Sequence, residues 1–153
     1  MNNFDAELLS ILETNGWSPD RRIEVDDKIK HLSDEGWEIF DAAKNFLTSF
    51  EGLPAFDRPL VEGYRIEFEC LGADPYRGIV SGWENQWGKV YPVAVAQYMY
   101  SIYIDEAGRL MMTDIDEWMY VFGNDTNQSL KAIFMPKYNS KKYSLGRVDI
   151  DHD

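Results

Sequence analysis

Two histidines and one cysteine are the residues on which nucleophilic chemistry in this chain would depend. A Ser, His and Asp triad needs an imidazole beside the nucleophile, and the chain offers His31, within a predicted helix, and His152, in the C-terminal tail. His31 lies beside an apolar stripe and among charges, which indicates a partly exposed helical residue rather than a general base. Cys70 shares the inward face of a predicted strand with Ile66 and Phe68, which favours a buried apolar thiol over a nucleophile.

Metal and phosphate chemistry also lack the residues that they need. A structural zinc site takes four Cys or His ligands, and the chain has three such residues. The segment DIDEWM at 114–119 has alternating acids but lacks the glycine of a calcium loop, and no Gly-rich phosphate-binding loop occurs. Asp114 and Asp116 would point the same way from a strand and could act as an acid and base pair, or be solvated edge acids. We expect no cofactor, no metal and no enzymatic activity.

The charge of the chain indicates which partners it can bind. The sequence has 27 Asp and Glu against 15 Lys and Arg, and residues 1–63 carry 14 of the acids with 6 basic residues. Such a surface repels phosphate backbones and anionic lipid headgroups, which argues against nucleic-acid or membrane binding and favours a basic protein partner. The alternative is that the acidity serves only solubility.

Large aromatic residues adjoin acids in the predicted loops. Aromatic side chains anchor protein interfaces, and neighbouring acids can pair with Lys or Arg of a partner. The alternative is that these rings are core residues packed beneath the loops. We predict that partner binding uses Trp83, Glu84, Trp87, Asp105, Glu106, Asp114, Asp116, Glu117 and Trp118.

Three amphipathic helices are predicted in the N-terminal third of the chain. Apolar residues recur at helical spacing in 4–16, 25–36 and 40–53, and a glycine stands at or near the end of each segment. Asp41 is the predicted N-cap of the third helix. These helices are expected to bury one face each.

The segment NGWSPDRRI, residues 15–23, separates the first two helices and concentrates a tryptophan and two arginines. We expect Trp17 to seal the junction of these helices, and Arg21 or Arg22 to pair with acids of the helical half. The segment is therefore assigned to architecture rather than to binding.

Strand patterns follow the helices. Alternation over 64–71 predicts a half-buried strand, and 91–104 predicts a second strand that turns at 105–108 and returns over 109–115. Residues 72–91 are predicted to be loop-rich, with a short strand near Ile79. A last helix over residues 127–135 is stopped by Pro136.

These elements predict an α+β domain in which N-terminal amphipathic helices pack on an antiparallel or mixed β-sheet, with a short C-terminal helix. A single domain over 1–137 and a polar, weakly ordered tail over 138–153 fit the length of the chain. One cysteine, no signal-peptide pattern and no apolar run of about 20 residues favour a soluble cytoplasmic protein.

The order of three motifs resembles the third subgroup of the SUKH superfamily of immunity proteins, which has the SMI/KNR-like fold. The motifs are GWSPDRR at 16–22, FLTSFEGL at 46–53 and the hairpin IDEAGRL at 104–110. Two features depart from the family pattern: Glu51 precedes a single Gly52 where two glycines are usual, and the tail has no counterpart.

The resemblance implies an α+β fold and an immunity protein of a bacterial polymorphic toxin or contact-dependent system. Such a protein binds a cognate toxin domain, often a nuclease or deaminase, and blocks it inside the producing cell. The family supplies no catalytic residues. A general protein-interaction or regulatory module of the same fold, without a toxin partner, is the alternative.

Overall fold

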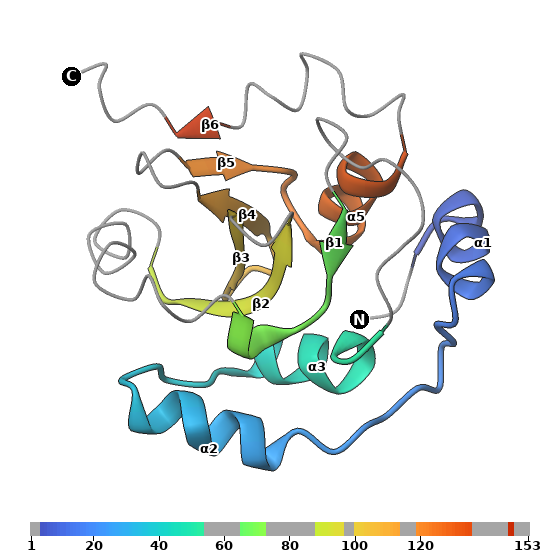
Figure 1. Cartoon of the computed structure of the whole chain (residues 1–153). Helices are drawn as coiled ribbons and strands as arrows, with labels where there is room; N and C mark the ends of the chain where they lie inside the picture. The colour runs from blue at the N-terminus through green and yellow to red at the C-terminus, as the bar shows by residue number, and fades with distance from the viewer. Residues whose placement is uncertain are drawn as a thin grey trace.

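The computed structural model describes residues 4–53, 65–72, 88–96, 100–113, 119–135 and 147–148. Within these ranges the strands form one antiparallel sheet in the order β1-β2-β3-β4-β5-β6. In Figure 1, α3 lies between the sheet and α2, and α1 lies near α5. This is the predicted α+β class. In chain order the elements are α1 (Ala6–Thr14), α2 (Asp26–Asp34), α3 (Asp41–Phe50), β1 (Ile66–Glu67), β2 (Val90–Ala96), β3 (Tyr100–Asp105), β4 (Leu110–Thr113), β5 (Met119–Val121), α5 (Thr126–Phe134) and β6 (Arg147–Val148).

The helices form where the sequence predicts them. Gly16 and Gly36 follow α1 and α2 with φ values of 99° and 101°, a region that glycine enters without a steric penalty. The predicted cap of α3 was wrong by one residue. Phe40 occupies the N-cap position, where its ring packs edge-on against Tyr91, and Asp41 is the first helical residue. There the carboxylate still interacts favourably with the helix dipole.

The segment predicted as one strand over 91–104 is two strands. β2 and β3 pair antiparallel from Val90 with Asp105 to Ala96 with Tyr100. Both strands are buried along nearly their whole length, so no change in hydrophobic pattern separates them. The connecting residues 97–99 contain none of the Gly, Pro, Asn or Asp residues that mark turns.

The predicted strand over 64–71 is a strand only at β1. Four residues were predicted to face inward: Ile66, Phe68 and Cys70 are buried, and Tyr64 lies outside the described residues. The described backbone leaves the sheet after two residues. The end of α3 supplies its hydrogen bonds instead: Gly52 N–H donates to the Phe68 carbonyl (2.7 Å), and the Glu51 carboxylate accepts from Cys70 N–H (2.9 Å).

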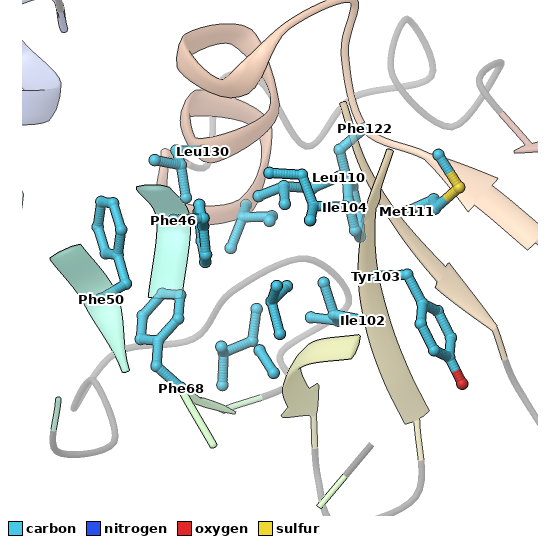
Figure 2. Packing of buried hydrophobic residues seen from close by; sticks show 14 of the residues in the cluster. Phe46, Phe50, Phe68, Ile102, Tyr103, Ile104, Leu110, Met111, Phe122 and Leu130 are labelled. Carbon is cyan, nitrogen blue, oxygen red and sulfur yellow. The ribbon is translucent and has the colours of Figure 1, made fainter. Parts of the chain in front are cut away.

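The core lies between the sheet and the helices. In Figure 2, Phe46 and Phe50 of α3 and Leu130 of α5 gather near Ile102 and Ile104, while Tyr103 and Met111 point to the other side of their strands. Tyr103 and Met111 are nevertheless fully buried, and the Trp37 ring stacks on Tyr103 with centroids 5.8 Å apart. Both faces of the central strands are therefore covered, which is uncommon for an antiparallel sheet.

The C-terminal region contains the predicted last helix, observed as α5. The returning strand predicted over 109–115 is observed as β4. In the tail, the structure describes Arg147–Val148, which pair with β5 as β6. The domain boundary at 137, weak order in the rest of the tail and the strand near Ile79 stay predictions, because they fall on residues outside the described ranges.

Candidate partner-binding surface

Trp17 is part of the fold, as predicted, but its observed partners differ from the predicted ones. The side chain is 2% exposed, and its ring stacks on Phe50 of α3 with centroids 5.5 Å apart and an interplanar angle of 13°. The indole N–H donates a hydrogen bond to Ser49 Oγ (2.9 Å), and the ring also contacts Phe4. Trp17 therefore joins its turn to the C-terminal half of α3.

Arg21 donates to backbone carbonyls at the end of α3, and it also interacts electrostatically with one acid of the helical half, Glu51. Its Nη1 donates to the Ser49 carbonyl (2.8 Å) and its Nη2 to the Glu51 carbonyl (2.9 Å). A helix leaves its last carbonyls without intrahelical partners, and its C-terminal end attracts a cation. Arg22 donates to the Arg21 carbonyl (2.7 Å).

The Glu51 side chain is buried and closes the same cluster. Its Oε2 pairs with Lys28 Nζ of α2 at 2.7 Å, and its Oε1 accepts the hydrogen bond from Cys70 N–H. The hydrogen bond with Glu51 raises the pKa of Lys28, and burial raises the pKa of the Cys70 thiol. Cys70 is thus the buried thiol that the sequence predicts. We call Trp17, Arg21, Lys28, Ser49 and Glu51 the motif joint.

Asp105 organises the predicted turn between β3 and β4. It is 1% exposed, and its carboxylate accepts hydrogen bonds from Ala107 N–H (3.0 Å), Arg109 N–H (2.9 Å) and Arg109 Nε (2.6 Å). Gly108 completes the turn with φ of 85°, and its carbonyl accepts from Thr126 Oγ1 (2.7 Å). The Asp105 carboxylate is therefore engaged by its own turn, and Glu106 is the exposed acid there.

A second charged region lies where α2 ends and α3 begins. Glu38 in this connection pairs with Lys89, just before β2, at 3.0 Å. Gly88, beside Lys89, lies close to the Glu106 carboxylate, since a Cβ built there would be 3.8 Å from Glu106 Oε1. These contacts bring the connection and the β3–β4 turn together. We call the exposed residues Asp34, Glu35, Glu38, Ile39, Asp41 and Glu106 the acidic face.

Ile39 adds an exposed apolar residue to the acidic face. It is 36% exposed, and among the described residues it is the one large hydrophobic residue that is exposed. Trp37 and Phe40, on either side of Glu38 and Ile39, are held by ring contacts with Tyr103 and Tyr91. The backbone that carries Ile39 is therefore anchored at both ends.

The two acids at the end of α2 stand at an unfavourable position of the helix. Asp34 and Glu35 lie at the helix C-terminus, where the helix dipole disfavours negative charge. Their partners are Lys30 (3.5 Å) and His31 (2.9 Å), in exposed pairs of a kind that contributes little to stability. His31 is the partly exposed helical residue that the sequence predicts.

The predicted binding residues belong to two ends of the sheet. Val90 pairs with Asp105, so the start of β2 and the 105–108 turn share one end, and Trp83, Glu84 and Trp87 precede that start in the sequence. Thr113 pairs with Ser101 and with Met119, so the connection holding Asp114, Asp116, Glu117 and Trp118 belongs to the other end. Two of these groups lie outside the described residues: Trp83, Glu84 and Trp87, and Asp114, Asp116, Glu117 and Trp118. Partner binding by all nine predicted residues stays a prediction.

Sequence reasoning missed most of the acidic face. Glu38, Ile39 and Asp41 follow Gly36, where the helical pattern is interrupted, and Ile39 stands between two aromatic residues that are buried or partly buried. The available signal was the run of acids that continues across two predicted helix ends.

The described residues hold no group of three or more His, Cys, Asp or Glu side chains placed to bind a metal. None of their helices has the length and apolar character needed to cross a membrane.

Neither the curated proteins nor the solved structures contain a match to the chain. The family model described as SUKH-3 immunity protein matches residues 4–135, from two residues before α1 to the residue after α5 and including the motif joint. The chain therefore belongs to the SUKH-3 immunity protein family, whose members inhibit toxins and are not enzymes.

Proposed function

We propose that this protein neutralises a cognate toxin domain of a polymorphic toxin system by covering the toxin's active cleft with the acidic face. The observation that carries the proposal is the set of exposed acids of the acidic face together with the exposed Ile39, because two of these acids, Asp34 and Glu35, stand where the dipole of α2 disfavours them. An exposed apolar residue beside charged residues is typical of a protein interface, which has an apolar core and a polar rim.

The toxin is proposed to be a nuclease or deaminase that acts on nucleic acid in the cytoplasm of the producing cell. An enzyme with such a substrate needs a basic cleft, because the substrate carries one negative charge per phosphate. The acidic face would compete for that cleft, and long-range attraction would speed association. The predicted residues Trp83, Glu84 and Trp87 precede β2 in the sequence, and we propose that they extend this surface. Glu106 is the predicted binding residue that lies within the described residues and belongs to the acidic face.

The other predicted group, Asp114, Asp116, Glu117 and Trp118, belongs to the opposite end of the sheet. Four residue pairs join β3 and β4, so the first and the last pair lie three steps apart, or about 10 Å at about 3.4 Å per residue. A standard interface covers about 800 Å² per partner, so one toxin domain has the size to reach both. We propose this group as the edge of the interface.

The test is copurification with the toxin domain encoded beside the gene, together with the activity of that toxin. We expect the protein to copurify with the toxin and to abolish its activity in proportion to the amount added. Recovery of a different partner, with full toxin activity in the presence of this protein, would instead support a regulatory module without a toxin.

Two double variants distinguish the effect of the acidic face on toxin binding from the effect of net charge. Glu38→Lys with Asp41→Lys is expected to weaken toxin binding at least about tenfold, since two rim charges are reversed. Glu7→Lys with Glu13→Lys changes the net charge equally on α1, where both acids are also exposed, and should change binding less than about threefold. Equal losses from both pairs would contradict a localised acidic face.

A further inference from the structure

Two connections between helices begin with the same local structure. Their sequences are LETNGW at 12–17 and LSDEGW at 32–37, in which three residues separate a leucine from Gly-Trp. In both, the glycine has a positive φ, and the tryptophan N–H donates to the leucine carbonyl at 3.0 Å. The leucine and the tryptophan are buried in each copy, as is usual for this helix ending. Each tryptophan therefore leaves its helix in a fixed direction.

The first connection binds to itself and back to α3. Ser18 Oγ and Asp20 Oδ1 are hydrogen-bonded within the turn (2.9 Å). Arg21 donates to two carbonyls at the end of α3, and Ile23 N–H donates to the Thr48 carbonyl (3.0 Å). The residues that follow the first tryptophan are thus used by the fold.

The second connection is fixed at both ends. The Trp37 ring stacks on Tyr103 with centroids 5.8 Å apart, and the Phe40 ring packs edge-on against Tyr91 with centroids 6.2 Å apart. Both tyrosines belong to the central strands and are fully buried. Residues 38–39 are the two positions between these rings, and both are exposed. Two residues between two fixed ones have little backbone freedom, so the connection presents them in one arrangement.

Ile39 and its charged neighbours indicate the chemistry of a partner. Ile39 is 36% exposed, and its β-branched side chain has few rotamers to lose on burial. Consecutive Cα atoms are about 3.8 Å apart, so the Cα atoms of the exposed acids Glu38 and Asp41 lie within about 8 Å of that of Ile39. A surface that covers Ile39 must therefore combine an apolar pocket with cations that replace the water around two carboxylates.

We propose that Ile39 is the apolar anchor of the toxin interface, and that the toxin receives it in an apolar pocket bordered by Lys or Arg. The identity of the partner rests on the proposed function, whereas the fixed connection rests on the ring contacts of Trp37 and Phe40. The acids attract the toxin over a distance and set the association rate, while the buried Ile39 sets the dissociation rate. Because residues 38–39 are held before binding, little conformational entropy is lost when the complex forms.

The rates of toxin binding to the full-length protein test the anchor. Ile39→Ser is expected to raise the dissociation rate at least about tenfold and to change the association rate less than about threefold. Its melting temperature should stay within about 2 °C of wild type, because the side chain is exposed. Ile39→Val should keep most of the residence time. Pro19→Ser is the matched control and should leave both rates unchanged, because Pro19 is exposed at the same position after Trp17 as Ile39 after Trp37.

The outcomes separate the anchor from the proposed function. A wild-type chain that neither binds nor inhibits the toxin would contradict both. A wild-type chain that inhibits the toxin, with an Ile39→Ser variant that dissociates at the wild-type rate, would overturn the anchor alone. A loss in Ile39→Ser that lies in the association rate would also overturn it.

Nitrogen-15 relaxation of the free protein tests the fixed connection without any toxin. We expect amide order parameters of about 0.85 at Glu38 and Ile39, the value of rigid backbone. Phe40→Ala removes the ring that contacts Tyr91 and should lower both values, while the amides of α2 keep theirs. Order parameters below about 0.6 at Glu38 and Ile39 of the wild-type chain would show that the connection is not fixed, and would overturn the presentation of Ile39.

Discussion

The helix pair α2 and α3 has two charged ends that differ in almost every physical respect. At one end, Lys28 near the start of α2 meets the buried Glu51 after α3, and Arg21 binds the last carbonyls of α3. At the other end, Glu35 and Glu38 are exposed and pair with the exposed cations His31 and Lys89. Charges that pair with the buried Glu51 or with helix carbonyls serve the fold, whereas an exposed acid that opposes a helix dipole, such as Glu35, indicates binding.

Removal of Trp17 is the largest perturbation of the motif joint. Trp17→Ala deletes a buried ring that stacks on Phe50 and leaves Ser49 Oγ without its donor. We expect the free energy of unfolding to fall by about 3–5 kcal/mol, measured by urea denaturation. Trp17→Phe keeps much of the packing and should cost less. A loss below about 1 kcal/mol, with toxin binding abolished, would move this turn from the fold to the interface.

Glu51→Ala should have the next largest effect. It leaves Cys70 N–H without its acceptor and Lys28 without its counter-ion. Because the Lys28 side chain is 38% exposed, water screens part of the loss, and we expect about 2 kcal/mol rather than the 3–5 kcal/mol of a fully buried pair. Glu51→Gln, which keeps an acceptor for Cys70, should lose less than Glu51→Ala.

The pH dependence of stability tests the same pair. Folding raises the pKa of Lys28, so the lysine binds its proton more tightly in the folded chain. Its contribution is complete below the unfolded pKa of about 10.4 and is lost as the pH rises through the higher folded value. The stability difference between wild type and Glu51→Gln should therefore be constant from neutral pH to about pH 10 and shrink above it. A difference that stays constant to pH 12 would show that the charge of Lys28 contributes nothing.

The neighbouring acids Asp105 and Glu106 of the β3–β4 turn show the same contrast, because Asp105 is buried and Glu106 is exposed. Asp105→Asn weakens three hydrogen bonds within the turn and should cost about 1–2 kcal/mol, measured by thermal unfolding. Glu106→Gln changes an exposed side chain of the acidic face and should stay within about 0.5 kcal/mol of wild type. The reverse order would mean that the turn depends on Glu106 instead.

The sequence is sufficient to predict features that depend on local pattern. Helical periodicity and the glycines after α1 and α2 predict those helices, and Asp105 with Gly108 predicts the turn. The division of residues 91–104 into two strands escapes prediction, because both are buried and no turn residue separates them.

Contacts distant in sequence are the other part that pattern cannot predict. Glu51 stands out in the sequence only as a departure from a motif, and its partners Cys70 and Lys28 lie 19 and 23 residues away. Ile39 has no local signal that separates it from its neighbours Trp37 and Phe40, because exposure depends on how the α2–α3 connection packs against Tyr91 and Tyr103. The fold class was therefore predictable, while the acidic face required the structure.

A small expected gain in stability gives the sharpest test of the comparison. Glu35→Lys places a cation at the C-terminal end of α2, where the dipole favours it, and should raise the free energy of unfolding by about 0.3–1 kcal/mol. Glu7→Lys, the same substitution in the first turn of α1, should lower it by a similar amount because the dipole there has the opposite sign. If Glu35 is retained for binding, Glu35→Lys is more stable yet binds the toxin less well, whereas Glu7→Lys is less stable and binds normally. A Glu35→Lys variant that is both more stable and fully able to bind would remove Glu35 from the acidic face.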